Sequence, residues 1–270
     1  MSGSVIHSQS AAMVPAVYSA GQSPQLPVAI DYPAALALRQ MSMVHDELPK
    51  YLLAPEVSAL LHYVPDLRRK MLLATLWNTG ARINEALALT RGDFSLAPPY
   101  PFVQLATLKQ RTEKAARTAG RTPAGQQTHR LVPLSDSWYV SQLQTMVATL
   151  KIPLERRNKR TGRTEKARIW EVTDRTVRTW IGEAVAAAAA DGVTFSVPVT
   201  PHTFRHSYAM HMLYAGIPLK VLQSLMGHKS ISSTEVYTKV FALDVAARHR
   251  VQFAMPEADA VALIKQLERR

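Results

Sequence analysis

Apolar residues recur at helical spacing along most of the chain, beginning at Pro55. A helix that Pro55 can open carries Val57, Leu60, Leu61 and Val64 on one face. The same spacing, together with capping residues, predicts six further helices. They cover residues 66–80, 83–89, 137–150, 174–190, 200–216 and 218–227.

Two short segments have the composition and alternation of strands. They are residues 102–109, with the sequence FVQLATLK, and residues 129–134, with HRLVPL. Residues 110–128 connect them as a loop much longer than a tight turn. The predicted fold class is therefore mainly α with a small antiparallel β-sheet.

The N-terminal part differs in texture from the rest of the chain. Residues 1–48 are rich in Ser, Pro, Ala and Gln, and four prolines interrupt any long element. They are predicted to be an arm or linker, partly disordered, with one short helix over residues 34–43. Residues 49–255 are expected to form the main domain.

The C-terminal part is predicted to hold two helices. One opens at Ser233 and contains Tyr237, and a linker is expected from about Phe241 to Pro256. Residues 256–270 are predicted to form the last helix. Its apolar seam consists of Val261, Leu263, Ile264 and Leu267.

Composition excludes several classes of protein. The chain has no cysteine, so it has no disulfide framework, thiolate metal site or cysteine nucleophile. Hydrophobic residues make up 47% of its 270 residues, which is too many for a mainly disordered chain. No window approaches the roughly 18 apolar residues of a membrane span. The N-terminus lacks the pattern of a secretory signal, so a cytoplasmic protein is expected.

The net charge of +12 is concentrated in two stretches. Residues 109–130 carry a net +5 and residues 151–168 a net +6. Such concentration is typical of a protein that binds a polyanion, whereas solubilising loops are the plainer alternative. A membrane surface is a weaker candidate because neither stretch has a bulky apolar face. The predicted DNA-binding residues are Arg111, Lys114, Arg117, Arg121, Arg156, Arg157, Lys159, Arg160, Arg163 and Lys166.

The segment from His202 to Tyr237 has the densest group of reactive side chains. His202 and Arg205 are three residues apart near a helix start, where free N–H groups and the helix dipole favour a phosphate. His228 directly follows Gly227 in a turn between two helices, and Tyr237 comes nine residues later. Each residue alone is most often structural. Together they predict an anion site with a hydroxyl nucleophile nearby.

Arg82 and Lys109 extend this site. Arg82 follows the Gly80 turn in TGARINEAL, at the start of a helix that includes Glu85. Its partner is either a substrate phosphate or Glu85, and the spacing leaves both open. Lys109 ends the first predicted strand beside a basic loop, where a cation can reach a phosphodiester.

These motifs make the sequence similar to the tyrosine recombinases, also called the phage integrase family, over about residues 53–241. TGARINEAL resembles the family's first arginine box, and FVQLATLK with RLVPL resembles its lysine hairpin. HTFRH and LMGHKSISSTEVY resemble the second and third boxes. The resemblance assigns as catalytic Arg82, Lys109, His202, Arg205, His228 and the nucleophile Tyr237, with Glu85 in support.

The resemblance implies a site-specific recombinase that cuts and rejoins DNA through a 3′-phosphotyrosine, with no metal, ATP or other cofactor. Its partner would be a double-stranded recombination site, paired in a homo-tetramer, and the free protein would be a monomer or weak oligomer. Accessory DNA-bending proteins are further candidate partners. The outcome would be resolution, integration or excision of mobile or plasmid DNA, as in the multimer-resolving recombinases of plasmids. Residues 49–255 would be the catalytic domain, and the helix at 256–270 would be exchanged between protomers.

Two features depart from the family's pattern. Most members carry a helical core-binding domain ahead of the catalytic domain, whereas about 50 residues precede it here. The arm is a candidate to replace part of that domain. The second departure is the loop at 110–128 next to Lys109, which has 19 residues.

Physical chemistry explains why such a set suffices. The two arginines can each give bidentate hydrogen bonds to the non-bridging oxygens, whose charge grows in the transition state. Tyr237, with an ordinary pKa near ~10, needs a base or a strong positive field. His202 is the better candidate base and Lys109 the better candidate acid, while His228 would hold a non-bridging oxygen.

Three alternatives remain from the residues. A type IB topoisomerase uses a similar set but relaxes supercoils, and the apolar C-terminal helix favours a recombinase over it. A metal hydrolase would use His202, His206 and His211, but no carboxylate lies among them. A non-catalytic DNA-binding protein would keep the basic stretches and have no need of Tyr237 at this position.

Overall fold

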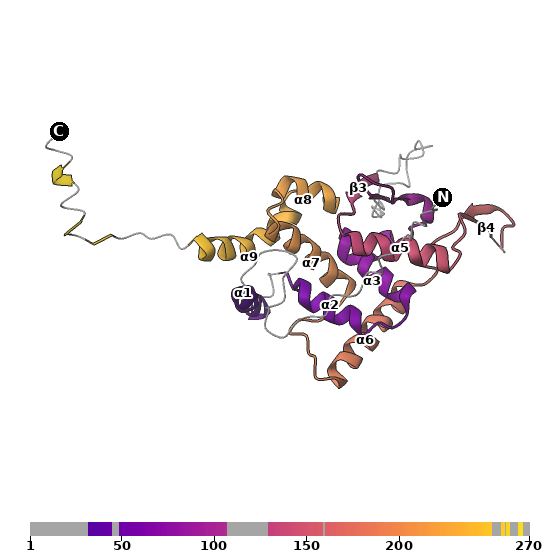
Figure 1. Ribbon diagram of the computed structural model, residues 1–270, viewed down its shortest axis with the longest axis horizontal. Coiled ribbons are helices and arrows are strands. Elements are labelled where there is room, and N and C mark those ends of the chain that lie inside the picture. The colour runs from indigo at the N-terminus through magenta and orange to yellow at the C-terminus, as the bar shows by residue number, and fades with distance from the viewer. Residues whose placement is uncertain are drawn as a thin grey trace, which may run out of the picture.

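The structure is a computed structural model that describes residues 32–44, 49–106, 129–158 and 160–249, with short pieces at 255–256, 258–259 and 264–266. Within these ranges helices dominate (Figure 1). The helices are α1 (Tyr32–Val44), α2 (Ala54–His62), α3 (Leu67–Thr79), α4 (Ile83–Leu87), α5 (Ser137–Thr149), α6 (Asp174–Ala190), α7 (Pro201–Tyr214), α8 (Leu219–Met226) and α9 (Ser232–His249), with a 3₁₀ turn η1 (Arg91–Asp93).

The predicted helix ends agree with the structure because the chain supplies the caps. The Asp66 carboxylate accepts the N–H of Arg69 at the start of α3, and the Thr200 hydroxyl accepts the N–H of Thr203 at the start of α7. Gly80 ends α3 in the left-handed region, with φ of 58°. The prediction of a mainly helical fold with a small antiparallel sheet is confirmed.

The main sheet has the order β1-β2-β3 and is antiparallel throughout. Its strands are β1 (Phe94–Ser95), β2 (Phe102–Ala106) and β3 (His129–Pro133). Val103 pairs with Val132, and both point into the core, whereas the adjacent Leu131 is exposed. Both predicted strands are therefore present. Lys109 and the loop that follows it lie outside the described residues.

The second basic stretch contains a hairpin that the sequence did not predict. Strands β4 (Glu155–Arg157) and β5 (Thr164–Lys166) pair antiparallel, with Arg156 opposite Glu165. Figure 1 shows this hairpin projecting from the body of the molecule. Each strand has only three residues, mostly charged, so no alternation of apolar and polar positions marks it.

Helix α3 lies at the centre of the hydrophobic core. Met71, Leu72 and Leu73 are completely buried, and α3 packs against both α5 and α7. The phenol of Tyr139 on α5 and the hydroxyl of Thr75 on α3 are hydrogen-bonded at 2.8 Å. This packing fixes the turn after α3 relative to α7, and those two segments carry the first two arginine motifs.

The first and last helices of the described elements, α1 and α9, are in contact. Helix α1, within the predicted arm, packs against α9. Arg39 of α1 pairs with Glu56 and also donates to the Ser196 hydroxyl at 2.5 Å. The arm therefore includes a segment attached to the domain.

Helix α9 is longer than predicted. It continues to His249, so the expected linker from about Phe241 is helical over its first part. Of the last predicted helix, the structure describes helical pieces at 258–259 and 264–266. In the described parts of the chain, none of the helices is long and apolar enough to span a membrane.

Candidate active site

The turn after α3 presents Arg82 and Glu85. Arg82 is the N-cap of α4, and its backbone N–H donates to Glu85 at 2.9 Å while its guanidinium donates at 3.0 Å. The carboxylate of Glu85 is fully buried, whereas the Arg82 side chain remains 40% exposed. The ion pair with Glu85 therefore orients Arg82 and still leaves part of its guanidinium open to a ligand.

Arg205 approaches the same turn from α7. Its guanidinium donates to the carbonyl oxygen of Gly80 and, at 2.7 Å, to that of Met226 at the end of α8. Burial and, after it, the charges of Arg82 and Arg130 lower the Arg205 pKa to about 10, so the group stays charged at neutral pH. The carbonyl oxygens of Gly80 and Met226 thus hold the buried guanidinium of Arg205, although two other arginines lie nearby.

His228 enters from the turn between α8 and α9. Gly227 ends α8 in the left-handed region, with φ of 64°, and turns the chain so that His228 follows at once. The ring nitrogen Nδ1 of His228 lies 2.9 Å from the Thr234 hydroxyl. Burial, followed by the charge of Arg205, lowers the His228 pKa to about 4, so the imidazole is neutral.

Tyr237 lies on α9 with only 2% of its surface exposed. Its phenolic oxygen is 2.9 Å from Nδ1 of His206, one turn beyond His202 on α7. Burial raises the Tyr237 pKa to about 12, and Arg205 and Arg82 act against that rise. Both arginines are therefore close enough to influence the phenol that would ionise.

Arg130, at the start of β3, joins the two halves of the site. It donates from Nη2 to Glu85 at 2.6 Å and from Nε to the carbonyl of Leu225 at 2.8 Å. Burial alone would raise the Glu85 pKa, but the hydrogen bonds and charges of Arg130 and Arg82 outweigh it and hold the pKa below its usual value. Arg130 thus connects the Arg82 turn to the end of α8.

These side chains form what we call the candidate cluster. Five of the six predicted catalytic residues and the supporting Glu85 are in it, and Lys109 lies outside the described residues. The sequence analysis did not name Arg130 or His206 as catalytic or supporting residues of the DNA-cleaving site. The members are Arg82, Glu85, Arg130, His202, Arg205, His206, His228 and Tyr237.

Comparison with known proteins places this cluster in a family. A model described as the phage integrase family matches residues 50–243, which include every described member of the cluster. The chain belongs to the phage integrase family. A resolvase of Escherichia coli strain K12 is 96% identical over 99% of this chain and 100% of that protein. A probable site-specific recombinase in the afa region of Escherichia coli is 48% identical over 90% of this chain and 92% of that protein.

A solved structure gives the same architecture. The post-cleavage complex of XerH site-specific recombinase with a palindromic difH substrate superposes with a TM-score of 0.53 at 18% identity. The match covers 76% of this chain and 53% of that one, so this chain spans about half of the larger protein. At that identity the likeness concerns the fold alone, which is the fold of the phage integrase catalytic domain.

The three histidines of the alternative metal-hydrolase interpretation do not converge. The rings of His202 and His206 stack with centroids 5.7 Å apart, and His206 faces Tyr237. His211 instead packs against Trp77, with centroids 4.8 Å apart. Among the residues that the structure describes, no group of three or more His, Asp or Glu side chains could hold a metal ion.

The predicted DNA-binding residues separate into two groups. Arg156 pairs with Glu165 at 2.8 Å and with Glu171 at 2.5 Å, so its charge is already compensated. On the other face of the hairpin, Arg157 and Lys166 are exposed. Arg160 and Arg163 are exposed near the tip, while Lys159 lies outside the described residues. Also outside them are Arg111, Lys114, Arg117 and Arg121.

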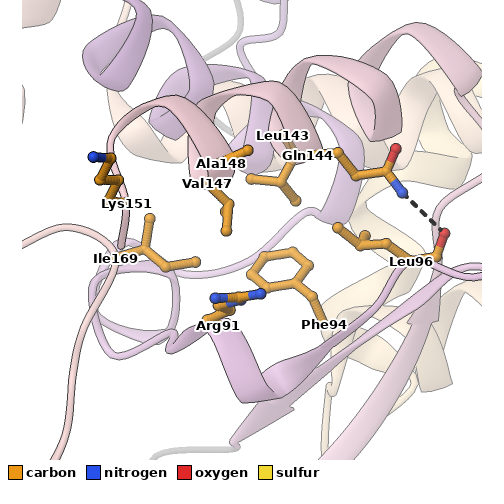
Figure 2. A pocket seen from close by; sticks show the side chains of 9 residues that line it. All are labelled: Arg91, Phe94, Leu96, Leu143, Gln144, Val147, Ala148, Lys151 and Ile169. Atoms are coloured by element: carbon orange, nitrogen blue, oxygen red, sulfur yellow. Dashed lines mark hydrogen bonds between the residues drawn. The ribbon is translucent and has the colours of Figure 1, made fainter. Parts of the chain in front are cut away.

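A cavity of about 420 Å³ lies away from the candidate cluster, between α5 and the segment from η1 to β1. Figure 2 shows Phe94, Val147 and Ile169 around it, with Arg91 and Lys151 at its edge. None of the cluster residues lines it. In this member of the phage integrase family the candidate cluster therefore lies outside that cavity, where α4, β3, α7, α9 and the α8–α9 turn meet.

Proposed function

We propose that this protein cuts and rejoins DNA at specific sites by forming a 3′-phosphotyrosine on Tyr237. The observation that carries the proposal is the position of the phenolic oxygen, which is hydrogen-bonded within the candidate cluster and influenced by the charges of Arg82 and Arg205. A hydroxyl surrounded by cations is suited to attack a phosphodiester, because the cations stabilise the added charge of the transition state. Membership of the phage integrase family supports the same reaction.

The roles within the cluster follow from charge and geometry. Arg82 and Arg205 would bind the two non-bridging oxygens, and His228 would donate a further hydrogen bond to one of them. Lys109 remains the candidate acid for the departing 5′-oxygen. The phosphotyrosine would conserve the energy of the broken bond, so rejoining needs neither ATP nor a metal.

The nucleophile can be identified by trapping. On a nicked suicide substrate, the protein should form a covalent DNA adduct that mass spectrometry maps to Tyr237, and the reaction should proceed in EDTA. Tyr237→Phe should abolish the adduct and leave DNA binding intact, which also separates an enzyme from a binding protein. An adduct on Tyr208 or Tyr214 of α7, or a need for divalent metal, would refute the proposal.

The biological role is proposed as resolution of plasmid or mobile DNA, acting on DNA in the cytoplasm. The 96% identical relative is named a resolvase, and the 48% identical one a probable site-specific recombinase. A recombinase should exchange strands between two sites, whereas a type IB topoisomerase relaxes any supercoiled plasmid. Resolution of a plasmid that carries two target sites, without relaxation of a plasmid that lacks them, distinguishes the two activities.

Assembly on DNA is proposed to use the C-terminal residues. Recombination requires four protomers on two duplexes, and a helix exchanged between protomers would coordinate them. Apolar side chains such as Ile264, which is 56% exposed, would be buried by such an exchange, with a gain of about 1.5–3 kcal/mol for each large side chain. Deletion of residues 257–270 should preserve binding to a half-site and abolish cooperative full-site binding and strand exchange. Normal recombination by the shortened chain would show that these residues have no such role.

A further inference from the structure

Of the two histidines on α7 that border the site, His206 rather than His202 contacts the nucleophile. Nδ1 of His206 is 2.9 Å from the phenolic oxygen of Tyr237. His202 is exposed and stacks on the outer side of the His206 ring, at 5.7 Å between centroids and 19° between planes. On the basis of the proposed function, we propose that His206 is a catalytic residue that accepts the phenolic proton of Tyr237 during DNA cleavage.

The protonation state of His206 suits an acceptor. Burial, and after it the charges of His202 and Arg205, lowers the His206 pKa to about 4, so the ring is neutral near pH 7. The groups that face it are His202 and Arg205 on α7, His228 on the α8–α9 turn and Tyr237 on α9. When the neutral ring carries its proton on Nε2, the Tyr237 hydroxyl, with a pKa raised to about 12, donates its hydrogen bond to Nδ1. The proton is therefore already aimed at His206 before DNA arrives.

Proton transfer in the free protein is unfavourable, because the phenol is a much weaker acid than the imidazolium. It becomes favourable during the reaction. As the Tyr237 Oη–phosphorus bond forms, the oxygen loses electron density and its proton becomes strongly acidic. The negative phosphate also favours the charged form of His206.

Cleavage exchanges one bond to phosphorus for another and moves two protons. The Oη–phosphorus bond forms, the bond from phosphorus to the 5′-oxygen breaks, and the phenolic proton moves to Nδ1 of His206. The departing 5′-oxygen receives a proton from a separate acid, for which Lys109 is the candidate. In the rejoining step the 5′-hydroxyl attacks phosphorus and gives its proton back to that separate acid. The phosphorus–Oη bond breaks, and His206 returns its proton to the phenolic oxygen.

The burial of Tyr237 adds a second consequence. Tyr237 is 2% exposed, and its phenolic oxygen is held by the hydrogen bond to His206 on α7. His206 therefore also positions the hydroxyl. A test must separate a residue that only positions the phenol from one that takes its proton.

The test compares single-turnover cleavage of a nicked suicide substrate by three variants. His206→Asn places an amide oxygen close to the position of Nδ1, which keeps an acceptor but removes the base, whereas His206→Ala removes both. Both variants should cleave about a hundredfold more slowly than the unsubstituted protein. His211→Asn, a change on the same helix outside the candidate cluster, should cleave normally. Cleavage by His206→Asn at the unsubstituted rate would overturn the proposal.

A second readout varies the acidity of the phenol itself. A fluorinated tyrosine incorporated at position 237 loses its proton more easily, so it should reduce the defect of His206→Asn at least tenfold. An unchanged defect would mean that His206 has only a structural role and would overturn the proposal.

The unsubstituted protein can still overturn the proposal if both His206 variants fail to fold. With His206 present, the cleavage rate should change little with fluorination, whereas a steep rise with phenol acidity would show that no base acts. The outcomes also distinguish the two proposals. Failure of the unsubstituted protein to form an adduct on Tyr237 refutes the proposed function, while a normal adduct rate in His206→Asn refutes only the role of His206.

Discussion

The candidate cluster and the β4–β5 hairpin are both rich in arginine, but they hold it in opposite ways. In the cluster, Arg205 and Arg130 are 3% and 8% exposed, and each donates to a backbone carbonyl. In the hairpin, which projects from the body of the molecule (Figure 1), Arg157 and Arg163 are exposed, although Nε of Arg157 donates to the carbonyl oxygen of Gly162 at 3.0 Å. The cluster buries its cations among fixed acceptors, whereas the hairpin keeps these two cations in contact with solvent.

This difference has a physical cost and a physical use. Burying several cations together is unfavourable, as the effect of Arg82 and Arg130 on the Arg205 pKa shows. The buried carboxylate of Glu85 offsets part of that repulsion. Fixed cations need no reorganisation during the reaction, which favours catalysis, whereas exposed cations favour DNA affinity. Substitutions in the candidate cluster should therefore lower the cleavage rate, whereas substitutions in the hairpin should lower DNA affinity.

The largest effect is expected for Arg205. Arg205→Ala should lower single-turnover cleavage by about a hundredfold or more, because the variant lacks a preorganised donor to the transition state. It should also lower the free energy of unfolding, since the carbonyls of Gly80 and Met226 would have no partner. Suicide-substrate cleavage and denaturant unfolding measure the two effects. Arg205→Lys keeps the charge without the forked donors, and full activity in that variant would contradict this expectation.

The next effect concerns stability and comes from Glu85. Glu85→Ala would leave the buried Arg130 without its anion, and breaking a buried pair costs about 3–5 kcal/mol. Denaturant unfolding of this variant, with Glu183→Ala on an exposed ion pair as control, measures the destabilisation. Equal effects of the two substitutions would mean that the buried pair contributes nothing special.

The same carboxylate should give a pH dependence of definite sign. Because the pKa of Glu85 in the folded protein lies below its ordinary value of 4.5, its contribution to stability is present above that value and disappears as pH falls through the folded pKa. Glu85→Gln should therefore lack this part of the acid destabilisation. An unchanged pH dependence of unfolding in Glu85→Gln would show that the carboxylate does not contribute in this way.

A smaller effect is expected at the turn that carries His228. At Gly227, with φ of 64°, an added Cβ would lie 2.9 Å from Nη1 of Arg130. Gly227→Ala should therefore cost about 1–2 kcal/mol in backbone strain and also displace Arg130. Gly216→Ala is a matched control, because its φ is 82° but nothing lies within 4 Å of the added Cβ. The difference between the free energies of unfolding of the two variants isolates the effect of the clash. Equal destabilisation would show that the Arg130 side chain moves aside at no cost.

The sequence predicts elements well where one residue carries the signal. Asp66, Thr200 and Gly80 each cap a helix through their own chemistry, so the boundaries of α3 and α7 follow from local sequence. The strands of the β4–β5 hairpin carry no such signal. Likewise, α9 continues past Phe241 and packs against α1 and α7, and no local pattern records these contacts.

The candidate cluster shows the same limit. Arg82 and Arg205 stand in motifs with fixed spacing, so the sequence could assign them. Arg130 looked like one more charge in a basic stretch, and only the tertiary fold buries it against Glu85 and α8. His206 stood in the motif HTFRH, but its contact with Tyr237 depends on how α7 and α9 pack. These contacts between distant elements could therefore be identified only in the structure.

The smallest effects are expected from single charges of the hairpin. Arg157 and Lys166 share one exposed face, whereas Arg156 on the other face is compensated by Glu165 and Glu171. Removing one side chain that binds a phosphate should flatten the log–log dependence of DNA affinity on salt by about 0.9. Neutralising Arg157, Arg163 and Lys166 together should therefore weaken binding to specific and random DNA alike, and titrations at several salt concentrations measure the slope.

The comparison with Arg156 sharpens this prediction. Arg156→Ala also removes one positive charge, but it exposes two carboxylates and leaves the phosphate-binding side chains in place, so it should change the salt slope less than Arg157→Ala. Arg178→Ala, an exposed arginine on α6 paired with Asp174, controls for net charge. If the triple variant binds with the same affinity and slope as the Arg178→Ala protein, the hairpin is a solvated surface element. In that case the contrast with the candidate cluster reflects burial alone, and DNA binding by the hairpin plays no part in it.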